Sequence, residues 1–250
     1  MSVILFATFG MNAEIDYSEI ANLIWHNESG SNPELIIFWN PREEFLSLGI
    51  GHFIWYPVSY QGPFEQVFPK FTQFCLQKKQ SVPEWIGASH APWSNRNTFL
   101  EDTSSPRFNQ LRLFLNHTRS LQAEFMKVRL ESELPKIIAQ IPQAEKSKIK
   151  KMLQTMQKYT MGMYALIDYL NFKGSGLKST ERYNGFGWGL LQVLQEMHPQ
   201  GNTIHDLLNS FADAAIYVLQ RRIKNAPPQR KEQAFLNGWL IRINTYRMSG

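Results

Sequence analysis

The sequence predicts a mainly helical α+β protein with one small antiparallel sheet near its N-terminus. Two observations lead to this fold class. Residues 34–58 contain two runs rich in β-branched and aromatic residues, Leu35–Trp39 and Gly51–Tyr56, with the turn signal Asn40-Pro41-Arg42 between them. Most of the remaining 250-residue chain shows apolar residues at helical spacing. We therefore expect one domain over residues 1–250, with residues 1–13 as a signal segment or an N-terminal extension.

The first predicted helix begins at Asp16 and ends before Gly30. Asp16-Tyr17-Ser18-Glu19 has the form of a capping box, and Gly30 with Asn32-Pro33 stops the helix. Apolar residues recur between these ends at i, i+3 and i+4, and Glu28 continues their stripe instead of the solvent face. The apolar members are Ile20, Leu23 and Ile24.

Further helices are expected in the rest of the chain, and Pro135 is a candidate break in the longest of them. Residues 80–105, with two prolines, are expected to be irregular. The predicted helices are Phe64–Lys79, Pro106–Gln140, Gln143–Gln157, Met161–Phe172, Trp188–Met197, Thr203–Lys224 and Arg230–Tyr246.

Composition limits the classes of site and partner. The net charge of +5 and pI near 9.2 favour polyanions: nucleic acid, anionic lipid or the acidic bacterial cell wall.

Cys75 is the only cysteine, which excludes an intrachain disulfide and a tetrathiolate zinc site. The six histidines form no metal-binding pair, so we expect no metal and no cofactor. No apolar run reaches the roughly 18 residues of a membrane span, and no nucleic-acid-binding motif is found.

Glu28 is the candidate catalytic acid. Cleavage of a glycosidic bond needs a carboxyl group that keeps its proton near neutral pH. A carboxyl group at the end of an apolar stripe is partly desolvated, which predicts a raised pKa for Glu28. The alternative is a glutamate that only terminates its helix.

The segment from Ser47 to His52, Ser-Leu-Gly-Ile-Gly-His, follows Glu28 inside the predicted sheet. Strand alternation would place Ser47, Gly49 and Gly51 on one face, where bare backbone allows close approach of a ligand. The Ser47 hydroxyl would position a water or a sugar hydroxyl there, and His52 would orient the hairpin by hydrogen bonding. A tight, glycine-containing strand pair packed under a helix is the structural alternative.

Glu28 followed by this Gly-Ile-Gly-His run resembles the phage-type lysozymes. The resemblance implies a lysozyme-like fold with Glu28 as the acid and Ser47 in place of the family's water-holding Thr. The family's second carboxylate, an Asp about eleven residues before the His, has no counterpart, because Asn40 and Pro41 occupy that region. Glu44 is our preferred substitute.

A second, local resemblance is to lytic transglycosylases and goose-type lysozymes. Residues 28–33, Glu-Ser-Gly-Ser-Asn-Pro, resemble the start of the transglycosylase motif, and residues 183–193 resemble a segment shared by both groups. This implies that Tyr183, Trp188 and Gln192 contact the glycan and that one glutamate suffices. On physical grounds alone, residues 185–189 are a flexible turn opening a helix, equally consistent with a plain loop.

These features predict an enzyme that cleaves the β-1,4 glycan backbone of peptidoglycan, with Glu28 as general acid and Gly49, Gly51 and His52 in the substrate site. Two alternatives remain open: a transglycosylase using Glu28 alone, and a catalytically inactive wall-binding protein. Glycan strands are the expected partner, and nucleic acid is not. A periplasmic or secreted location is expected, a cytoplasmic one stays open, and the oligomeric state is not specified by the sequence.

Overall fold

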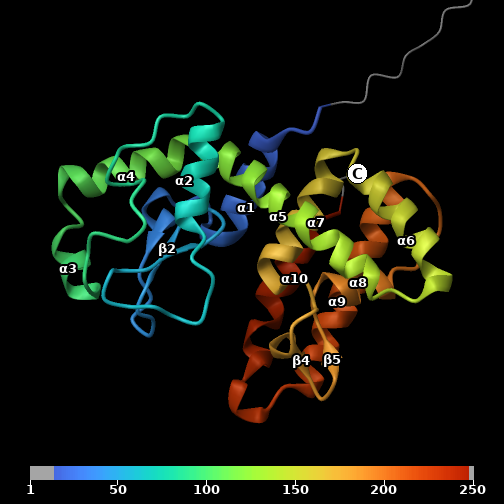
Figure 1. Ribbon diagram of the computed structural model, residues 1–250. Coiled ribbons are helices and arrows are strands. Elements are labelled where there is room, and N and C mark those ends of the chain that lie inside the picture. The colour runs from blue at the N-terminus through green and yellow to red at the C-terminus, as the bar shows by residue number, and fades with distance from the viewer. Residues whose placement is uncertain (1–13, 248–250) are drawn as a thin grey trace, which may run out of the picture.

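A computed structural model describes residues 14–247. It contains ten α-helices and two small antiparallel sheets within that range, which confirms the α+β class (Figure 1). The expectation of a signal segment falls on residues 1–13, outside the described residues. The helices are α1 Tyr17–Ser29, α2 Phe68–Gln77, α3 Arg96–Glu101, α4 Pro106–His117, α5 Arg119–Ala139, α6 Gln143–Met156, α7 Thr160–Lys173, α8 Leu190–Glu196, α9 Ile204–Asn225 and α10 Leu236–Asn244.

The N-terminal sheet has three strands in the order β1-β2-β3, spanning Ile37–Phe38, Leu46–Leu48 and Phe53–Trp55. Ser47 pairs with Phe38 on one side and with Ile54 on the other. Leu46 and Leu48 point into the core, so Ser47 and its two cross-strand partners share the opposite face. The predicted sheet region is confirmed, with residues 33–36 forming a 3-10 turn instead of strand.

The chain folds into two lobes joined by α1 and α5 (Figure 1). One lobe contains the three-stranded sheet with α2, α3 and α4, and the other lobe contains α6 to α10. Helix α1 packs along α5 and also against α7. One hydrophobic cluster runs through both lobes, from Trp55 and Phe71 to Tyr169 and Phe211. Because α1 runs through the junction, its C-terminal end brings Glu28 to the boundary between the lobes.

The long helical segment breaks at Thr118 and not at Pro135. Thr118 separates α4 from α5, and its hydroxyl donates to the Phe114 carbonyl oxygen at 2.7 Å. Pro135 lies inside α5 on its exposed side. There the helical carbonyl that a proline leaves without a donor can bind water, so the helix continues.

Two elements differ from the sequence prediction. The segment expected to be a flexible turn forms a second hairpin, β4 Arg182–Tyr183 with β5 Phe186–Gly187, so the prediction of a sheet confined to residues 34–58 is wrong. Asn184 and Gly185 connect these strands with φ of 49° and 83°, the backbone of a two-residue hairpin turn. The expected irregular stretch contains α3, whose N-terminus is capped by the Asn95 side chain.

Candidate active-site cleft

Glu28 lies in the last turn of α1, and its side chain is 18% exposed. Asp16 accepts hydrogen bonds from the backbone of residues 18 and 19, and Gly30 ends the helix with φ of 60° as predicted. The predicted capping box is only half formed, because the Asp16 backbone N–H donates to Thr160 and not to Glu19. Ile20 and Ile24 are fully buried on the same face. The expectation that Glu28 continues the buried stripe is therefore confirmed.

Opposite Glu28, residues 49–52 form a tight turn after β2. Gly49 has φ of 72°, and a Cβ there would lie 2.3 Å from Oε1 of the buried Gln122. That oxygen accepts the Ile50 backbone N–H at 2.8 Å, while the Gln122 amide donates to the Leu115 carbonyl oxygen at 2.7 Å. Gln122 thus fixes the turn to α5. The predicted strand alternation for Gly49 and Gly51 is wrong, because β2 ends at Leu48.

The Glu28 carboxylate has two cationic or potentially cationic partners. Oε2 lies 3.0 Å from Nε2 of His52, and Oε1 accepts a 2.6 Å hydrogen bond from Nη2 of Arg242. His52 belongs to the turn and is 47% exposed, whereas Arg242 comes from α10 and is buried. His52 therefore contacts Glu28 directly. The hydrogen bond predicted for His52 is made to the candidate acid and not within the hairpin.

Arg242 is held by a second, fully buried carboxylate, Asp168 of α7. Its Nε and Nη2 donate to Asp168 Oδ2 and Oδ1 at 2.9 and 2.7 Å. The Tyr246 hydroxyl donates to Asp168 Oδ2 at 2.6 Å. The Phe172 ring lies 4.1 Å from the guanidinium carbon. Three segments far apart in sequence therefore meet at Glu28.

The predicted raised pKa of Glu28 is wrong. Burial raises it, but the His52 hydrogen bond and the charge of Arg242 outweigh burial and lower the pKa to about 2. Desolvation, the only effect visible in the sequence of α1, raises the pKa of Glu28. The charges that lower this pKa come from the turn and from α10. Glu28 is an ionised carboxylate in the resting structure.

Glu28 and His52 stand between two connected hollows. One, of about 390 Å³, lies between the lobes, and the other, of about 200 Å³, lies beside Phe38 of the sheet. The larger is lined by Glu28, Gly51, His52, Phe53, Ile54, Phe64, Glu65, Val67, Phe125, Met126, Arg129, Asn171, Phe172 and Lys178. We call the two hollows together the cleft. It combines aromatic side chains with the carboxylates of Glu28 and Glu65 and the cations of Arg129 and Lys178.

The structure separates Glu44 from the cleft. Glu44 is exposed before β2 and lines neither hollow. Ser47 shares its sheet face with Phe38 and Ile54, which line the two hollows, although Ser47 itself lines neither. Glu65 is the carboxylate that lines the cleft together with Glu28. A hydrogen bond from Lys70 lowers the pKa of Glu65, so it too is ionised.

Tyr183, Trp188 and Gln192 lie in the other lobe and do not line the cleft. Gln192 accepts the Gly189 N–H at 3.0 Å through Oε1, which stabilises the start of α8. The Tyr183 hydroxyl donates to Glu232 at 2.9 Å, and its ring packs 4.5 Å from the buried Trp188 ring. The structure therefore brings Gly49, Gly51 and His52 to Glu28. Packing and capping contacts in the other lobe involve Tyr183, Trp188 and Gln192 instead.

Sequence reasoning missed Arg242 and Glu65. Arg242 has one signal: it is a lone charge in the apolar run Trp239-Leu240-Ile241-Arg242-Ile243, a pattern that indicates a buried ion pair. Glu65 gives no comparable signal, because it precedes α2 in an ordinary polar loop. Asp168 reaches Glu28 through Arg242.

Across residues 14–247, no cluster of His, Cys, Asp and Glu has the geometry to hold a metal ion. Within the same range, none of the helices combines the length and apolar character that crossing a membrane requires. No protein-family model matches the chain, and comparison with curated proteins and with solved structures finds no match.

Proposed function

We propose that the cleft binds and cleaves the β-1,4 glycan backbone of peptidoglycan, with Glu28 delivering the proton to the bridging oxygen. The observation that carries the proposal is the position of Glu28: a partly buried carboxyl group between two hollows, opposite a turn of bare backbone. Arg129 and Lys178 add positive charge to the lining of the larger hollow, which suits a wall polymer with acidic substituents. Such an activity requires export to the periplasm or the exterior.

An ionised Glu28 needs a proton source, and His52 is placed to supply it. A proton on His52 Nε2 would move along the 3.0 Å contact to Glu28 Oε2, and from there to the leaving oxygen. Oε1 would keep its hydrogen bond from Arg242 throughout. The exposed edge of the His52 ring would then regain a proton from solvent. Glu28 would thus be a relay whose neutral form exists during the reaction.

The second carboxylate decides the type of reaction. Inverting hydrolysis needs a base that activates water on the far side of the sugar. Glu65 lines the same cleft, so Glu65→Gln should abolish hydrolysis, whereas Glu44→Gln should retain it. If Glu28 works alone, as in transglycosylases, Glu65→Gln stays active and the product is an anhydro-sugar.

A catalytically inactive wall-binding protein is the second candidate. Its support is the pairing of Glu28 with Arg242 and His52, which holds the pKa of the carboxyl at about 2. A carboxylate held this way can bind sugar hydroxyls without transferring a proton. The cleft would then recognise the glycan strand and leave it intact.

Digestion of purified peptidoglycan separates these candidates. The protein is incubated with cell-wall sacculi from pH 4 to pH 8, and soluble fragments are analysed by mass spectrometry, in which an anhydro product is one water lighter. Cleavage that disappears in Glu28→Gln supports the enzyme. Sedimentation with sacculi and no released fragments supports the binding protein. Full cleavage by Glu28→Gln would contradict the proposed role of Glu28.

A further inference from the structure

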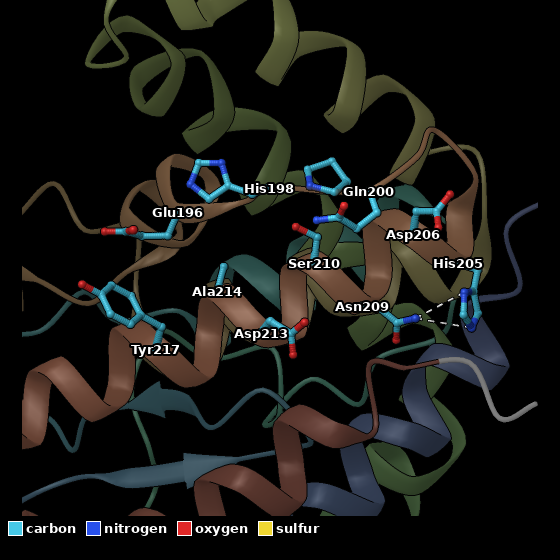
Figure 2. Close-up of a pocket in the computed structure, with 11 residues that line it drawn as sticks. Glu196, His198, Gln200, His205, Asp206, Asn209, Ser210, Asp213, Ala214 and Tyr217 are labelled. Carbon is cyan, nitrogen blue, oxygen red and sulfur yellow. Dashed lines mark hydrogen bonds between the residues drawn. The ribbon is translucent and has the colours of Figure 1, made fainter.

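A second cavity, of about 490 Å³, lies in the other lobe along α9, apart from the cleft. Figure 2 shows it as a groove between α9 and the loop that follows α8, with His198 and Gln200 on the loop side and Ser210 and Ala214 between the walls. It shares no lining residue with either hollow at Glu28. Its volume lies within the range of ligand-binding cavities.

The groove follows the helix for three turns. His205, Asn209, Asp213 and Tyr217 recur every four residues on α9 and form one polar edge. At about 1.5 Å per residue, this edge is roughly 18 Å long, which suits an extended chain molecule better than a compact metabolite. Ser210 and Ala214 are buried and small, so they leave the hollow open beside this edge.

Two of the three carboxylates that line the groove have cationic partners, and the third, Asp206, accepts hydrogen bonds from the backbone N–H and the hydroxyl of Thr203. Arg221 donates to Glu196 at 2.6 Å, and Arg247 donates to Asp213 at 2.5 Å. Charge compensation at Glu196 and Asp213 reduces the attraction that a free acidic groove would have for a cation. It also orients each carboxylate, so that lone pairs not used by arginine can accept hydrogen bonds from a neutral ligand.

Other polar groups in the groove are uncommitted. Within residues 14–247, the side chains of His198, Gln200, Ser210 and Tyr217 form no hydrogen bond to another protein group, whereas the Asn209 amide contacts His205 and accepts a 3.2 Å hydrogen bond from Arg247. Donors and acceptors without protein partners on both the loop side and the helix side of the groove suit a ligand with many hydroxyl and amide groups.

Two exposed aromatic rings extend the groove at the end marked by Tyr217. Tyr217 is 51% exposed, and Phe186 of the second hairpin is 48% exposed. The Arg221 guanidinium lies between them, 5.3 and 5.6 Å from their ring centres. Rings fixed by a stacked arginine offer apolar faces of the kind that pack against pyranose rings.

We propose that this groove is a second binding site, for a neutral oligosaccharide chain. Hydroxyl and acetamido groups would bond to the polar edge of α9 and to the facing loop, while a sugar ring packs on Tyr217. The site would hold a glycan strand without cleaving it, and it requires neither Glu28 nor the proposed activity of the cleft.

The test uses tetra-N-acetylchitotetraose as the probe, followed by amide NMR so that the two sites are read separately. Titration should shift the amides of residues 205–217, and Tyr217→Ala should weaken binding there about tenfold. Shifts at residues 49–52 report the cleft and should be unchanged by that variant. Tyr159→Ala, which removes another exposed tyrosine of the same lobe, is the matched control and should bind as the wild type does.

Three outcomes would overturn the proposal: no shift at residues 205–217, shifts with an affinity that Tyr217→Ala leaves unchanged, or spermidine binding in the groove where chitotetraose does not. The last outcome would assign the groove to a cation. Loss of cleavage in the cleft would leave the chitotetraose result at α9 unaffected, so failure of the two proposals can be told apart.

Discussion

Replacing Glu28 by Gln should change how the stability of the protein depends on pH. The folded-state pKa of Glu28 is about 2, below its ordinary value of 4.5. The ionised carboxylate therefore stabilises the fold above pH 4.5, and this contribution is lost as the pH falls from about 4.5 to about 2. At about 1.36 kcal/mol per pKa unit, the full contribution is about 3 kcal/mol.

The measurable part of this effect lies between about pH 6 and pH 3. Over that interval the wild type should lose roughly 2 kcal/mol relative to Glu28→Gln, because at pH 3 the carboxylate in the folded state is still mostly ionised. Urea unfolding followed by circular dichroism at several pH values gives both free energies of unfolding. Their difference cancels the contributions of titrating groups that do not interact with Glu28.

Glu44→Gln is the matched control, because Glu44 is exposed and contacts neither Arg242 nor His52. Its free energy of unfolding should run parallel to that of the wild type over the same pH range. If the difference between wild type and Glu28→Gln were constant with pH, or grew toward acid, the ion pairs at Glu28 would not stabilise its charged form. The account of the cleft electrostatics would then be refuted.

Three further substitutions test the surroundings of the cleft by urea unfolding. Arg242→Met should destabilise the fold by about 3–5 kcal/mol, because it leaves the Asp168 carboxylate buried without its cation; an equally stable variant would contradict this. Burial and nearby arginines lower the pKa of Lys173 to about 6, so the folded state disfavours its charge and stability should rise from about pH 6 toward pH 10. Lys173→Met should therefore stabilise the protein at pH 7 by about 2 kcal/mol, and destabilisation would refute the reasoning. Gly49→Ala should cost about 2 kcal/mol or more, because its Cβ would meet Gln122, whereas Gly30→Ala, with similar φ and open space, should cost about 1 kcal/mol.

Features set by neighbouring residues could be predicted from the sequence. The ends of α1 depend on Asp16 and Gly30, and both act within one helical turn, so the predicted helix and the partly buried Glu28 are confirmed. The Asn184-Gly185 hairpin was equally local, since that pair with flanking aromatic residues is a standard two-residue turn signal. It was missed because the glycines of residues 185–189 were interpreted as the entry to a helix.

Features that depend on distant segments could not be predicted in this way. The sequence around Gly49 predicts exposed backbone, but only the fold shows that the turn is fixed by Gln122, 72 residues away. Arg242 lies 214 residues from Glu28 and reverses the expected direction of its pKa shift. Neighbours on the same helix determine the desolvation of Glu28 that the sequence predicts. The charges that lower its pKa come from distant segments and are brought near only by the tertiary structure.

The charged groups around Glu28 show what the two functional candidates share and where they differ. Glu28 and Asp168 both pair with Arg242, and Asp168 takes two of the arginine hydrogen bonds. Asp168 thus offsets much of the positive charge of Arg242 on its buried side. His52 is the partner of Glu28 on the solvent-exposed side. Under the proposed function, a sugar in the cleft would reach the half-exposed His52 and would leave the buried Arg242 in place. The contact that lowers the pKa of Glu28 in the resting protein is therefore also the one route by which a described neighbour can protonate it. In an enzyme, His52 would transfer a proton to Glu28 when the glycan binds. In a binding protein, the contact between His52 and Glu28 would break without proton transfer.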